Sequence, residues 1–480
     1  MEYKTKGIYP EDALRYFEDL TRIPHGSGNE AGIAQYLLDF AKEHGLWAKT
    51  DDIHNVYMKK PGSKGMEELP AVLLQGHTDM VCAKTEDSAH DFEKDPLTLI
   101  VDNGLLHADR TTLGADNGVA VALMLAMLAR DDFPRPPIEC LFTTQEETGL
   151  CGAQEADLSC FSANRLINLD GGPEGMVVAG SAGGLRMDFD LSPAYEPASG
   201  KILEIKVCGL LGGHSGTMID KEHGNANKLM GRVLHGLPCA WNLVTLSGGS
   251  KDNAIPQECT AVIALPEADA GAAVSAVQKL EADFQTELQG SDPGVCVRIS
   301  PAEADRMMSR ADSDTMMKLL FLLPCGVMTR NLVLNAVTTS MNVGTIATNA
   351  DGIHLVCSLR SSSATELAYL ADRLRMLGAL LGLRVSDGAG YPAWGYTPVS
   401  PLRDLCAEVY QEQTGKELQM AAIHGGLECG LFKEKRPELD IVSMGPEADG
   451  AHTPDETLDL ASFGRFYDFL KGVLVRLTEK

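Results

Sequence analysis

The hydrophobic pattern predicts helices and buried strands that alternate through the first 183 residues. Apolar residues recur with helical spacing in three segments, residues 13–23, 31–45 and 119–130. Ser27 and Glu30 match the capping-box pattern at the start of the second helix. Three short, strongly apolar runs that end in polar or glycine residues predict buried strands, at residues 71–76, 138–144 and 165–170. This alternation favours an α/β fold in which helices sandwich a mixed, mostly parallel sheet.

A second pattern begins near Leu185 and continues to about residue 394. Strands are expected at residues 201–207, 241–246, 258–265, 294–300, 332–340, 354–360 and 383–388, with helices at 225–237, 270–288, 314–323 and 365–381. A further helix, strand and terminal helix are expected at residues 400–413, 438–445 and 456–477. We therefore expect one domain formed by residues 1–184 and 395–480, with an inserted α+β domain of two similar halves at residues 185–394.

The composition is that of an acidic globular protein. Of the 480 residues 44% are hydrophobic, and 41 Lys and Arg stand against 67 Asp and Glu, so the formal net charge is −26. This charge repels phosphate backbones and anionic lipids, which argues against nucleic acid and membrane surfaces as partners. The longest apolar run, Val119–Ala129, has eleven residues, whereas a membrane span needs about 20. The N-terminal segment lacks the apolar core of a signal peptide, so we expect a cytoplasmic protein.

Two sequence motifs resemble known patterns, but their own residues or the residues around them do not support the corresponding function. Residues 26–31 satisfy the glycine pattern of a dinucleotide-binding loop, but they follow a predicted helix rather than a strand. Residues 212–217 resemble a nucleophile elbow, yet Thr217 stands in place of its last glycine. The twelve cysteines include no CxxC pair, which argues against a zinc ribbon or a compact disulfide framework. We therefore expect neither phosphate nor hydride chemistry, and we expect reduced core cysteines.

A set of acidic and histidine residues lies at the ends of the predicted elements. His77 and Asp79 follow strand 71–76, and because they are two residues apart in an extended chain their side chains point the same way. The other members lie before helix 119–130, after the next two strands and before the terminal helix: Asp116, Glu146, Glu147, Asp170 and His452. The carboxyl ends of parallel strands meet at one edge of a sheet, where ligands bind.

Each of these residues also has a simpler interpretation. His77 alone could be structural, Asp116 could be a helix N-cap, and Glu146 with Glu147 could form a solvated acidic turn. Together, however, several unpaired acids at one sheet edge would repel each other. Two divalent ions would neutralise them, and nitrogen and oxygen ligands favour Zn²⁺, Co²⁺ or Mn²⁺ over Ca²⁺ or copper. Such ions are about 3.5–4 Å apart and need a bridging carboxylate.

These motifs resemble those of the co-catalytic di-zinc exopeptidases, a family that includes aminoacylases, glutamate carboxypeptidases and cytosolic dipeptidases. Within that family, the sequence is similar to the bacterial aminoacyl-histidine (Xaa-His, carnosinase-like) dipeptidases over almost the whole chain. The segments that carry the resemblance are GHTDMVCAK, TTLGADNGVA, QEETGLCGA, GGHSG, GGSKDNAIP, HGGLECGLF and GAHTPDE. The resemblance implies a zinc-peptidase catalytic domain with an inserted lid and dimerisation domain.

The resemblance also implies how a pair of metal ions, Zn²⁺ first, would be bound. Asp116 would bridge the two ions. His77 and Asp170 would complete one site, and Glu147 and His452 would complete the other. Every ligand of the family pattern is thus present in the chain.

Further residues take catalytic roles by the same resemblance. Asp79 would orient His77 and fix its tautomer. Glu146 would be the general base that takes a proton from the water bridging the ions and delivers it to the leaving amine. His214 would reach the active site of a partner subunit and stabilise the oxyanion, although it could instead be a surface loop residue. The chain is therefore expected to work as a homodimer formed through the lid domain.

Substrate contacts complete the expected site. Asn253 and Arg360 match positions that hold the backbone and the terminal carboxylate of a dipeptide, and an Arg fork suits a carboxylate. His424 and Glu428 are further candidate substrate contacts. The sequence thus predicts a metal-dependent dipeptidase for Xaa-His and related dipeptides. The alternatives are another exopeptidase or an N-acyl amino acid deacylase of the family, or a catalytically silent relative that binds peptide or metal.

Overall fold

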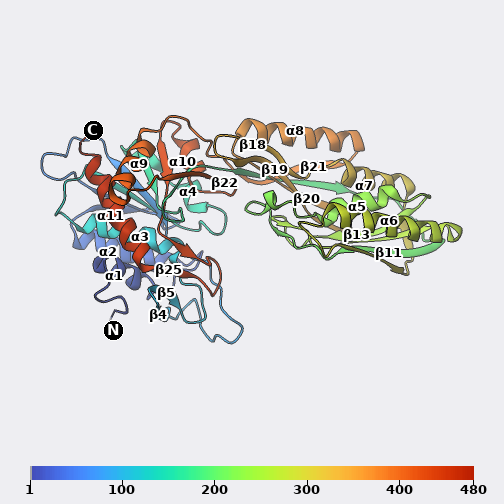
Figure 1. The fold of residues 1–480 in the computed structure, drawn as a ribbon, viewed down its shortest axis with the longest axis horizontal. Coiled ribbons are helices and arrows are strands. Elements are labelled where there is room, and N and C mark those ends of the chain that lie inside the picture. The colour runs from blue at the N-terminus through green and yellow to red at the C-terminus, as the bar shows by residue number, and fades with distance from the viewer. Residues whose placement is uncertain (1–2, 480) are drawn as a thin grey trace. The chain divides into compact units, whose positions relative to one another are not determined.

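The protein forms two compact units in the computed structural model, which describes residues 3–479 (Figure 1). Unit 1 comprises the described residues up to 180, residues 396–422 and the described residues from 427 onward. Unit 2 comprises residues 181–395 and 423–426. Each unit has its own sheet and its own hydrophobic core. Within residues 3–479, no helix combines the length and the apolar character that crossing a membrane requires.

Unit 1 is built on an eight-stranded mixed sheet in the order β1-β2-β6-β3-β7-β23-β8-β22. Its strands are β1 (Trp47–Thr50), β2 (Val56–Lys60), β3 (Val72–His77), β6 (Ile138–Thr143), β7 (Arg165–Asn168), β8 (Met176–Ser181), β22 (Gln419–Ile423) and β23 (Asp440–Ser443). The central strands β6, β3, β7 and β23 are parallel, whereas β1, β2 and β8 run antiparallel to their neighbours. The expected α/β fold with a mixed sheet is confirmed, and its parallel pairing is confined to the centre.

Helices cover this sheet and bury its apolar strands (Figure 1). They are α1 (Glu11–Leu20), α2 (Ala31–Glu43), α3 (Ala115–Ala129), α4 (Cys151–Glu155), α9 (Pro401–Thr414), α10 (Cys429–Lys435) and α11 (Leu460–Arg476), with a 3-10 turn at Leu158–Cys160. Helix α3 packs on α1 and β3, and almost all of its residues are buried, which explains why it is apolar around its whole circumference. A Cβ on Gly76 would come within 2.4 Å of the Ala120 Cβ, so this glycine lets α3 approach the end of β3.

A second, four-stranded sheet of unit 1 has the order β24-β25-β5-β4. Its strands are β4 (Leu99–Asp102), β5 (Leu105–Ala108), β24 (Ala448–Asp449) and β25 (Thr457–Asp459). The loop between β24 and β25 carries His452, so this small sheet holds both ends of that loop.

Unit 2 contains a nine-stranded antiparallel sheet in the order β16-β11-β15-β13-β19-β20-β9-β21, with β18 paired to β19. Its strands are β9 (Gly183–Leu191), β11 (Lys201–Cys208), β13 (Asn242–Gly248), β15 (Cys259–Leu265), β16 (Cys296–Pro301), β18 (Gly326–Asn331), β19 (Ala336–Asn349), β20 (Gly352–Ser361) and β21 (Arg384–Tyr391). Buried and more exposed residues alternate along β11, because helices cover one face of the sheet.

The remaining elements of unit 2 complete its core and its loops. The helices are α5 (Ala226–Gly236), α6 (Ala270–Glu287), α7 (Arg310–Leu322) and α8 (Ala364–Leu381), with 3-10 turns at Ile219–Lys221 and Glu267–Asp269. Two short antiparallel pairs join β10 (Tyr195–Pro197) to β17 (Arg306–Met308) and β12 (Gly213–His214) to β14 (Ala254–Ile255). The helices all pack against the large sheet and enclose one continuous core.

Three local predictions are wrong. The strand expected from Leu332 begins at Ala336, because Leu332 and Val333 lie in the preceding turn, where they are 91% and 74% exposed. The terminal helix begins at Leu460, since the residues before it pair with β5 as β25. Ser27 does not cap α2: Glu30 occupies the N-cap position and its side chain makes no capping hydrogen bond. The Ser27 hydroxyl instead donates to the Asp79 carboxylate, a charged and therefore stronger acceptor.

Candidate metal centre

Three neighbouring parallel strands end at one edge of the sheet in unit 1. Strand β3 ends at His77, whose register partner on β6 is Thr143, and β7 pairs with the other side of β3. The acidic pair Glu146–Glu147 follows β6, and Asp170 follows β7 by two residues. The topology therefore brings together side chains that are up to 93 residues apart in sequence.

Two loops bring Asp116 and His452 to the same edge. Asp116 lies in the first turn of α3, where its backbone leaves the helical conformation (φ −86°, ψ 100°). It is not an N-cap, since Gly114 occupies that position with a left-handed backbone and no side chain caps the helix there. His452 lies in the loop between β24 and β25. The simpler interpretation of Asp116 as a helix cap is therefore excluded.

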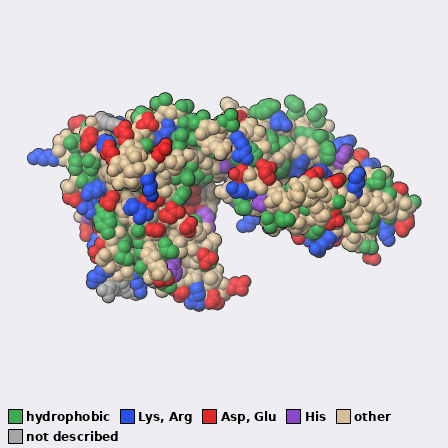
Figure 2. Space-filling model, in the orientation of Figure 1, with side chains coloured by type: hydrophobic (Ala, Val, Ile, Leu, Met, Phe, Trp, Pro, Cys, Tyr) green, Lys and Arg blue, Asp and Glu red, His purple; other side chains and the backbone are tan. Residues whose placement is uncertain are grey.

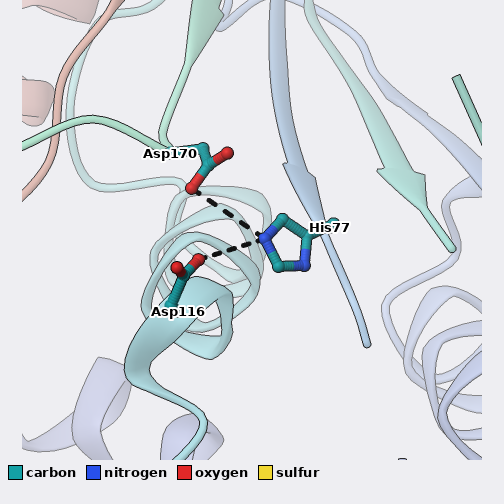
Figure 3. A group of neighbouring side chains, drawn as sticks. All are labelled: His77, Asp116 and Asp170. Carbon is teal, nitrogen blue, oxygen red and sulfur yellow. Dashed lines mark hydrogen bonds and ion pairs between the residues drawn. The ribbon is translucent and has the colours of Figure 1, made fainter. Parts of the chain in front are cut away.

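The Asp116 carboxylate faces two imidazoles. Its Oδ1 lies 3.1 Å from His77 Nε2, which is also 3.9 Å from Asp170 Oδ1 (Figure 3). Its Oδ2 lies 3.3 Å from His452 Nε2, which is 2.7 Å from Glu147 Oε1. One aspartate thus contacts a histidine with each of its two oxygens.

Two groups of potential ligand atoms share this aspartate. His77, Asp116 and Asp170 form one group, and Asp116, Glu147 and His452 form the other, with the ligand atoms of each group within 4.8 Å of one another. A third group, which overlaps both, adds Glu146 to His77 and Glu147. Nitrogen and carboxylate donors in this number fit borderline divalent ions such as Zn²⁺. The residues present therefore fit a pair of metal ions, and the two groups would share Asp116.

The electrostatics of the cluster reflect buried charges in contact. Burial favours a higher pKa for Asp116, but the hydrogen bonds from His452 and His77 outweigh it and lower the pKa of that carboxylate. The same contact with Asp116, followed by that with Glu147, raises the pKa of His452 to about 10. Burial, reinforced by the charge of Asp116, raises the pKa of Asp170 well above its usual value. Burial also raises the pKa of Glu146, to about 8. Protons thus balance the acids of the metal-free cluster, and divalent ions would take the place of these protons.

Asp79 supports the cluster without joining it. The Nδ1–H group of His77 donates to the Asp79 backbone oxygen at 3.0 Å, which leaves Nε2 facing Asp116. The Asp79 carboxylate lies 3.5 Å from that same Nδ1 atom. It also accepts hydrogen bonds from the backbone N–H groups of Glu146 (3.0 Å) and Glu147 (3.3 Å). Asp79 therefore connects the end of β3 to the acidic turn after β6.

A buried polar network lies one step further down the same strands. Gln75 and Asn168 precede His77 and Asp170 by two residues, so each points to the same face as the later residue. Glu428, at the start of α10, accepts hydrogen bonds from Gln75 Nε2 (2.5 Å) and Thr143 Oγ1 (2.9 Å), and Asn168 donates to Gln75 Oε1 (2.6 Å). Glu428 is fully buried in these contacts and joins the strands beneath the cluster, and its role as a substrate contact stays a prediction. Sequence reasoning missed the network, although the i, i+2 spacing of Gln75 and His77 was a usable signal.

A cavity of about 390 Å³ opens beside the cluster. Its lining includes Asp116 and Asp170, together with residues 446–449 and Ala451. Two carboxylates of the cluster are therefore accessible to a small molecule.

The other expected site residues lie in unit 2. His214 pairs with Ala254, the neighbour of Asn253, between β12 and β14. Arg360, on β20, is buried and donates to the Tyr391 hydroxyl at 2.7 Å, while its Nε has no hydrogen-bond partner. His424 lies 2.7 Å from the Ser340 hydroxyl oxygen. Burial and the charge of Arg360 lower the pKa of His214 and lower that of His424 to about 4. A buried cation and two neutral imidazoles thus share one region of unit 2.

Comparison with known proteins identifies the family. The protein-family model described as Peptidase family M20/M25/M40 matches residues 73–476 of the sequence. The chain belongs to this family. The expected hydrolase class and the resemblance to metal-dependent exopeptidases are thereby confirmed.

Two relatives of this M20 chain align with it over nearly its full length. The cytosol non-specific dipeptidase of Escherichia coli (strain K12) is 35% identical over 479 residues, which cover 98% of this chain and 99% of the relative. The structure of the aminoacylhistidine dipeptidase from Vibrio alginolyticus superposes with a TM-score of 0.90 at 34% identity, and the match covers 98% of this chain and 97% of that one. Aminopeptidase PepT from Bacillus cereus, with a TM-score of 0.58 at 14% identity, shares the fold.

Proposed function

We propose that this M20 protein is a two-metal dipeptidase that hydrolyses Xaa-His and related dipeptides. The observation that carries the proposal is the shared Asp116, whose two oxygens face the two histidines of separate ligand groups. The names of the two relatives that align over nearly the full chain support the substrate class.

The two ligand groups define how the ions would be held. His77 and Asp170 would bind one ion, Glu147 and His452 the other, and Asp116 both. Zn²⁺ fits this donor set, as do Co²⁺ and Mn²⁺. When bound, the ions would acidify a water molecule and polarise the scissile carbonyl.

Glu146 is the residue best placed to move the proton. It lies next to the ligand Glu147, in the group that also includes His77, and its backbone is tied to Asp79. Burial raises its pKa to about 8, so in the metal-free site it holds a proton more readily than an ordinary glutamate. As general base it would take a proton from the attacking water and pass it to the leaving amine.

Unit 2 would supply the contacts to the substrate. The Arg360 guanidinium is buried and its Nε–H has no hydrogen-bond partner, which suits the terminal carboxylate of a dipeptide. Asn253 would hold the substrate backbone, and His424 would be a further substrate contact. His214, the neutral imidazole beside them, would stabilise the oxyanion in the active site of a partner subunit.

The same proposal assigns a role to each of the two units. Unit 1 would take the catalytic role expected of residues 1–184 and 395–480, and unit 2 the lid and dimerisation role expected of residues 185–394. Residues 181–184, 395 and 423–426 belong to unit 2. Helix α8 supports a homodimer, since Tyr369, Met376 and Leu380 are spaced along one helical face and are 65%, 67% and 79% exposed. We place this dipeptidase in the cytoplasm, as the name of its E. coli relative suggests.

A dipeptide panel combined with metal analysis tests the proposal. We expect two ions per chain, loss of activity on dialysis against a chelator, and recovery with Zn²⁺, Co²⁺ or Mn²⁺. Gly-His and β-Ala-His should be cleaved in preference to tripeptides and N-acetyl amino acids. Preference for tripeptides or N-acetyl amino acids would indicate another M20 activity, and metal binding without turnover would indicate a silent relative.

Two adjacent glutamates provide a matched pair of variants. Glu146→Ala should keep both ions and lose roughly 100-fold or more in kcat, because it removes the proton carrier alone. Glu147→Ala should instead weaken metal binding, because it removes a ligand. Full turnover by Glu146→Ala would refute the assigned base.

A further inference from the structure

Glu456 lies four residues after His452, at the end of the loop that carries this histidine. Its side chain is only 2% exposed. Within residues 3–479 its carboxylate forms no salt bridge, and its partners are backbone N–H groups of another segment. A buried carboxylate without a cationic partner is costly, so its contacts need a physical explanation.

The Glu456 carboxylate binds the backbone immediately before and at Asp116. Oε2 accepts hydrogen bonds from Leu113 N (2.8 Å) and Gly114 N (3.0 Å), and Oε1 accepts one from Asp116 N (3.1 Å). N–H groups at the start of a helix have no partner within the helix, and they attract negative charge. Glu456 therefore supplies, from a distant segment, the cap that no residue at the start of α3 provides.

This cap holds a backbone that the helix itself does not determine. Gly114 has a left-handed conformation (φ 72°), and the non-helical backbone at Asp116 directs its carboxylate toward both histidines. Helical hydrogen bonding cannot fix such a turn, because its residues lie outside the helical geometry. The three hydrogen bonds to one carboxylate constrain it directly.

The same contact fixes the loop of His452. Glu456 N donates to Thr453 O (3.2 Å), and Thr453 donates to Gly450 O through its N–H (3.1 Å) and its hydroxyl (2.7 Å). The loop is therefore a compact turn whose last residue is joined to the Asp116 segment. His452 itself is half exposed, so little packing on its own side chain holds it in place.

We propose that Glu456 is a positioning residue that sets Asp116 and His452 at the separation required to bind one metal ion together with Glu147. This inference rests on the proposed two-metal function and adds a residue to it. Glu456 acts through the Asp116 backbone and through its own loop, and it touches neither substrate nor ion. Its loss should therefore weaken the site formed by Asp116, Glu147 and His452 more than the site formed by His77, Asp116 and Asp170.

Zn²⁺ binding to the full-length protein tests this role. The measurement is competition with a chromophoric chelator, alongside the thermal unfolding of the metal-free protein. Glu456→Gln keeps the size of the side chain but replaces one acceptor oxygen with an NH₂ group that faces backbone N–H donors. We expect one ion per chain to bind with only a small loss of affinity and the other to bind roughly 10–100-fold more weakly. Glu456→Asp, which keeps the charge on a shorter side chain, should show a smaller loss.

Glu139→Gln is the control, and unlike Glu456 the Glu139 carboxylate also pairs with Lys59 (3.3 Å). Glu139 is also buried and accepts hydrogen bonds from the backbone of another loop, at Ser162 and Ala163, but it lies at the opposite end of β6 from the cluster. Its substitution should lower the unfolding temperature without changing Zn²⁺ affinity. Restoration of kcat by excess Zn²⁺ in Glu456→Gln, but no such effect in the control, would support positioning.

The outcomes separate this proposal from the proposed function. If the wild type binds two ions and Glu456→Gln binds both with unchanged affinity, Glu456 has only a structural role and the inference is overturned. If the wild type binds fewer than two ions, the two-metal function fails and the inference fails with it.

Discussion

At the scale of single residues, Asp79 orders several groups from a buried position. Its carboxylate accepts hydrogen bonds from the Ser27 hydroxyl and from the backbone N–H groups of Glu146 and Glu147. Its backbone oxygen accepts one from His77 Nδ1. One aspartate thus sets both the tautomer of a candidate ligand histidine and the position of the acidic turn.

Asp79→Asn should reduce kcat roughly 10–100-fold, because an amide cannot accept from all three donors and the acidic turn loses its anchor. Steady-state kinetics on Gly-His and metal analysis measure the effect. Ser27→Ala removes only one of these hydrogen bonds and should cause a smaller loss in kcat. An Asp79→Asn enzyme with wild-type kcat would show that the acidic turn holds its position without this carboxylate.

The sequence predicted the acidic and histidine residues of the cluster better than the hydrogen bonds that hold them in place. His77 and Asp79 stand out because they follow a strongly apolar strand, and Glu146 and Glu147 because they follow another. The hydrogen bonds from these glutamates to Asp79 span 67 and 68 residues, so only the pairing of β3 with β6 reveals them. Ser27 was misassigned for the same reason: a local pattern gave no information about a distant, charged acceptor.

At the scale of secondary structure, the sequence predicted the buried strands correctly but failed at exposed or very short segments. Strands β3, β6 and β7 are buried along nearly their whole length, and a continuous apolar run is a strong signal for such strands. Leu332 and Val333 are equally apolar but lie in an exposed turn, which hydrophobicity alone cannot distinguish from a strand end. Strand β25 was missed because three residues carry too little pattern, and its pairing with β5 is long-range.

Glu428 joins the start of α10 to β3 and β6 beneath the cluster, and its charge should make the metal-free protein sensitive to pH. Burial raises its pKa from 4.5 to about 7. The titratable groups that interact electrostatically with the Glu428 carboxyl are His77, Asp79, Glu146, Asp170 and the Cys429 thiol. Ionisation is therefore less favourable in the folded protein than in the unfolded chain. Stability from this group is complete below pH 4.5 and is lost as pH rises toward about 7.

Glu428→Gln removes this titration. In the presence of a chelator, the unfolding temperature of the wild type should fall by a few degrees more than that of the variant between pH 5 and pH 8. Differential scanning calorimetry of both proteins across this range provides the comparison. Parallel pH profiles would mean that the Glu428 carboxyl titrates as it does in the unfolded chain.

At the scale of the whole molecule, the cluster and the expected substrate contacts belong to different units. All candidate metal ligands lie in unit 1, whereas His214, Asn253, Arg360 and His424 lie in unit 2. Hydrophobic periodicity gave the sequence ranges of the two patterns but carries no signal for contacts between subunits. Unit 2 nevertheless presents an apolar surface: Figure 2 shows hydrophobic side chains along the border of this unit where α8 lies in Figure 1.

If α8 forms the dimer interface, charges on its exposed apolar face should separate the subunits. The double variant Met376→Glu/Leu380→Glu places two carboxylates where an interface would bury them without partners. Sedimentation velocity should show a dimer for the wild type and a monomer for this variant, while the exposed substitution Gln278→Glu on α6 should leave the dimer intact.

The monomer also tests the role of His214. Because that histidine is proposed to act in the partner's active site, the monomer should still bind two Zn²⁺ ions through unit 1 but lose most of its dipeptidase activity. Adding a dimeric variant that is inactive through Glu146→Ala should not restore activity, because the monomer cannot associate with it. A monomer with full kcat would show that each chain completes its own active site and that His214 serves no partner.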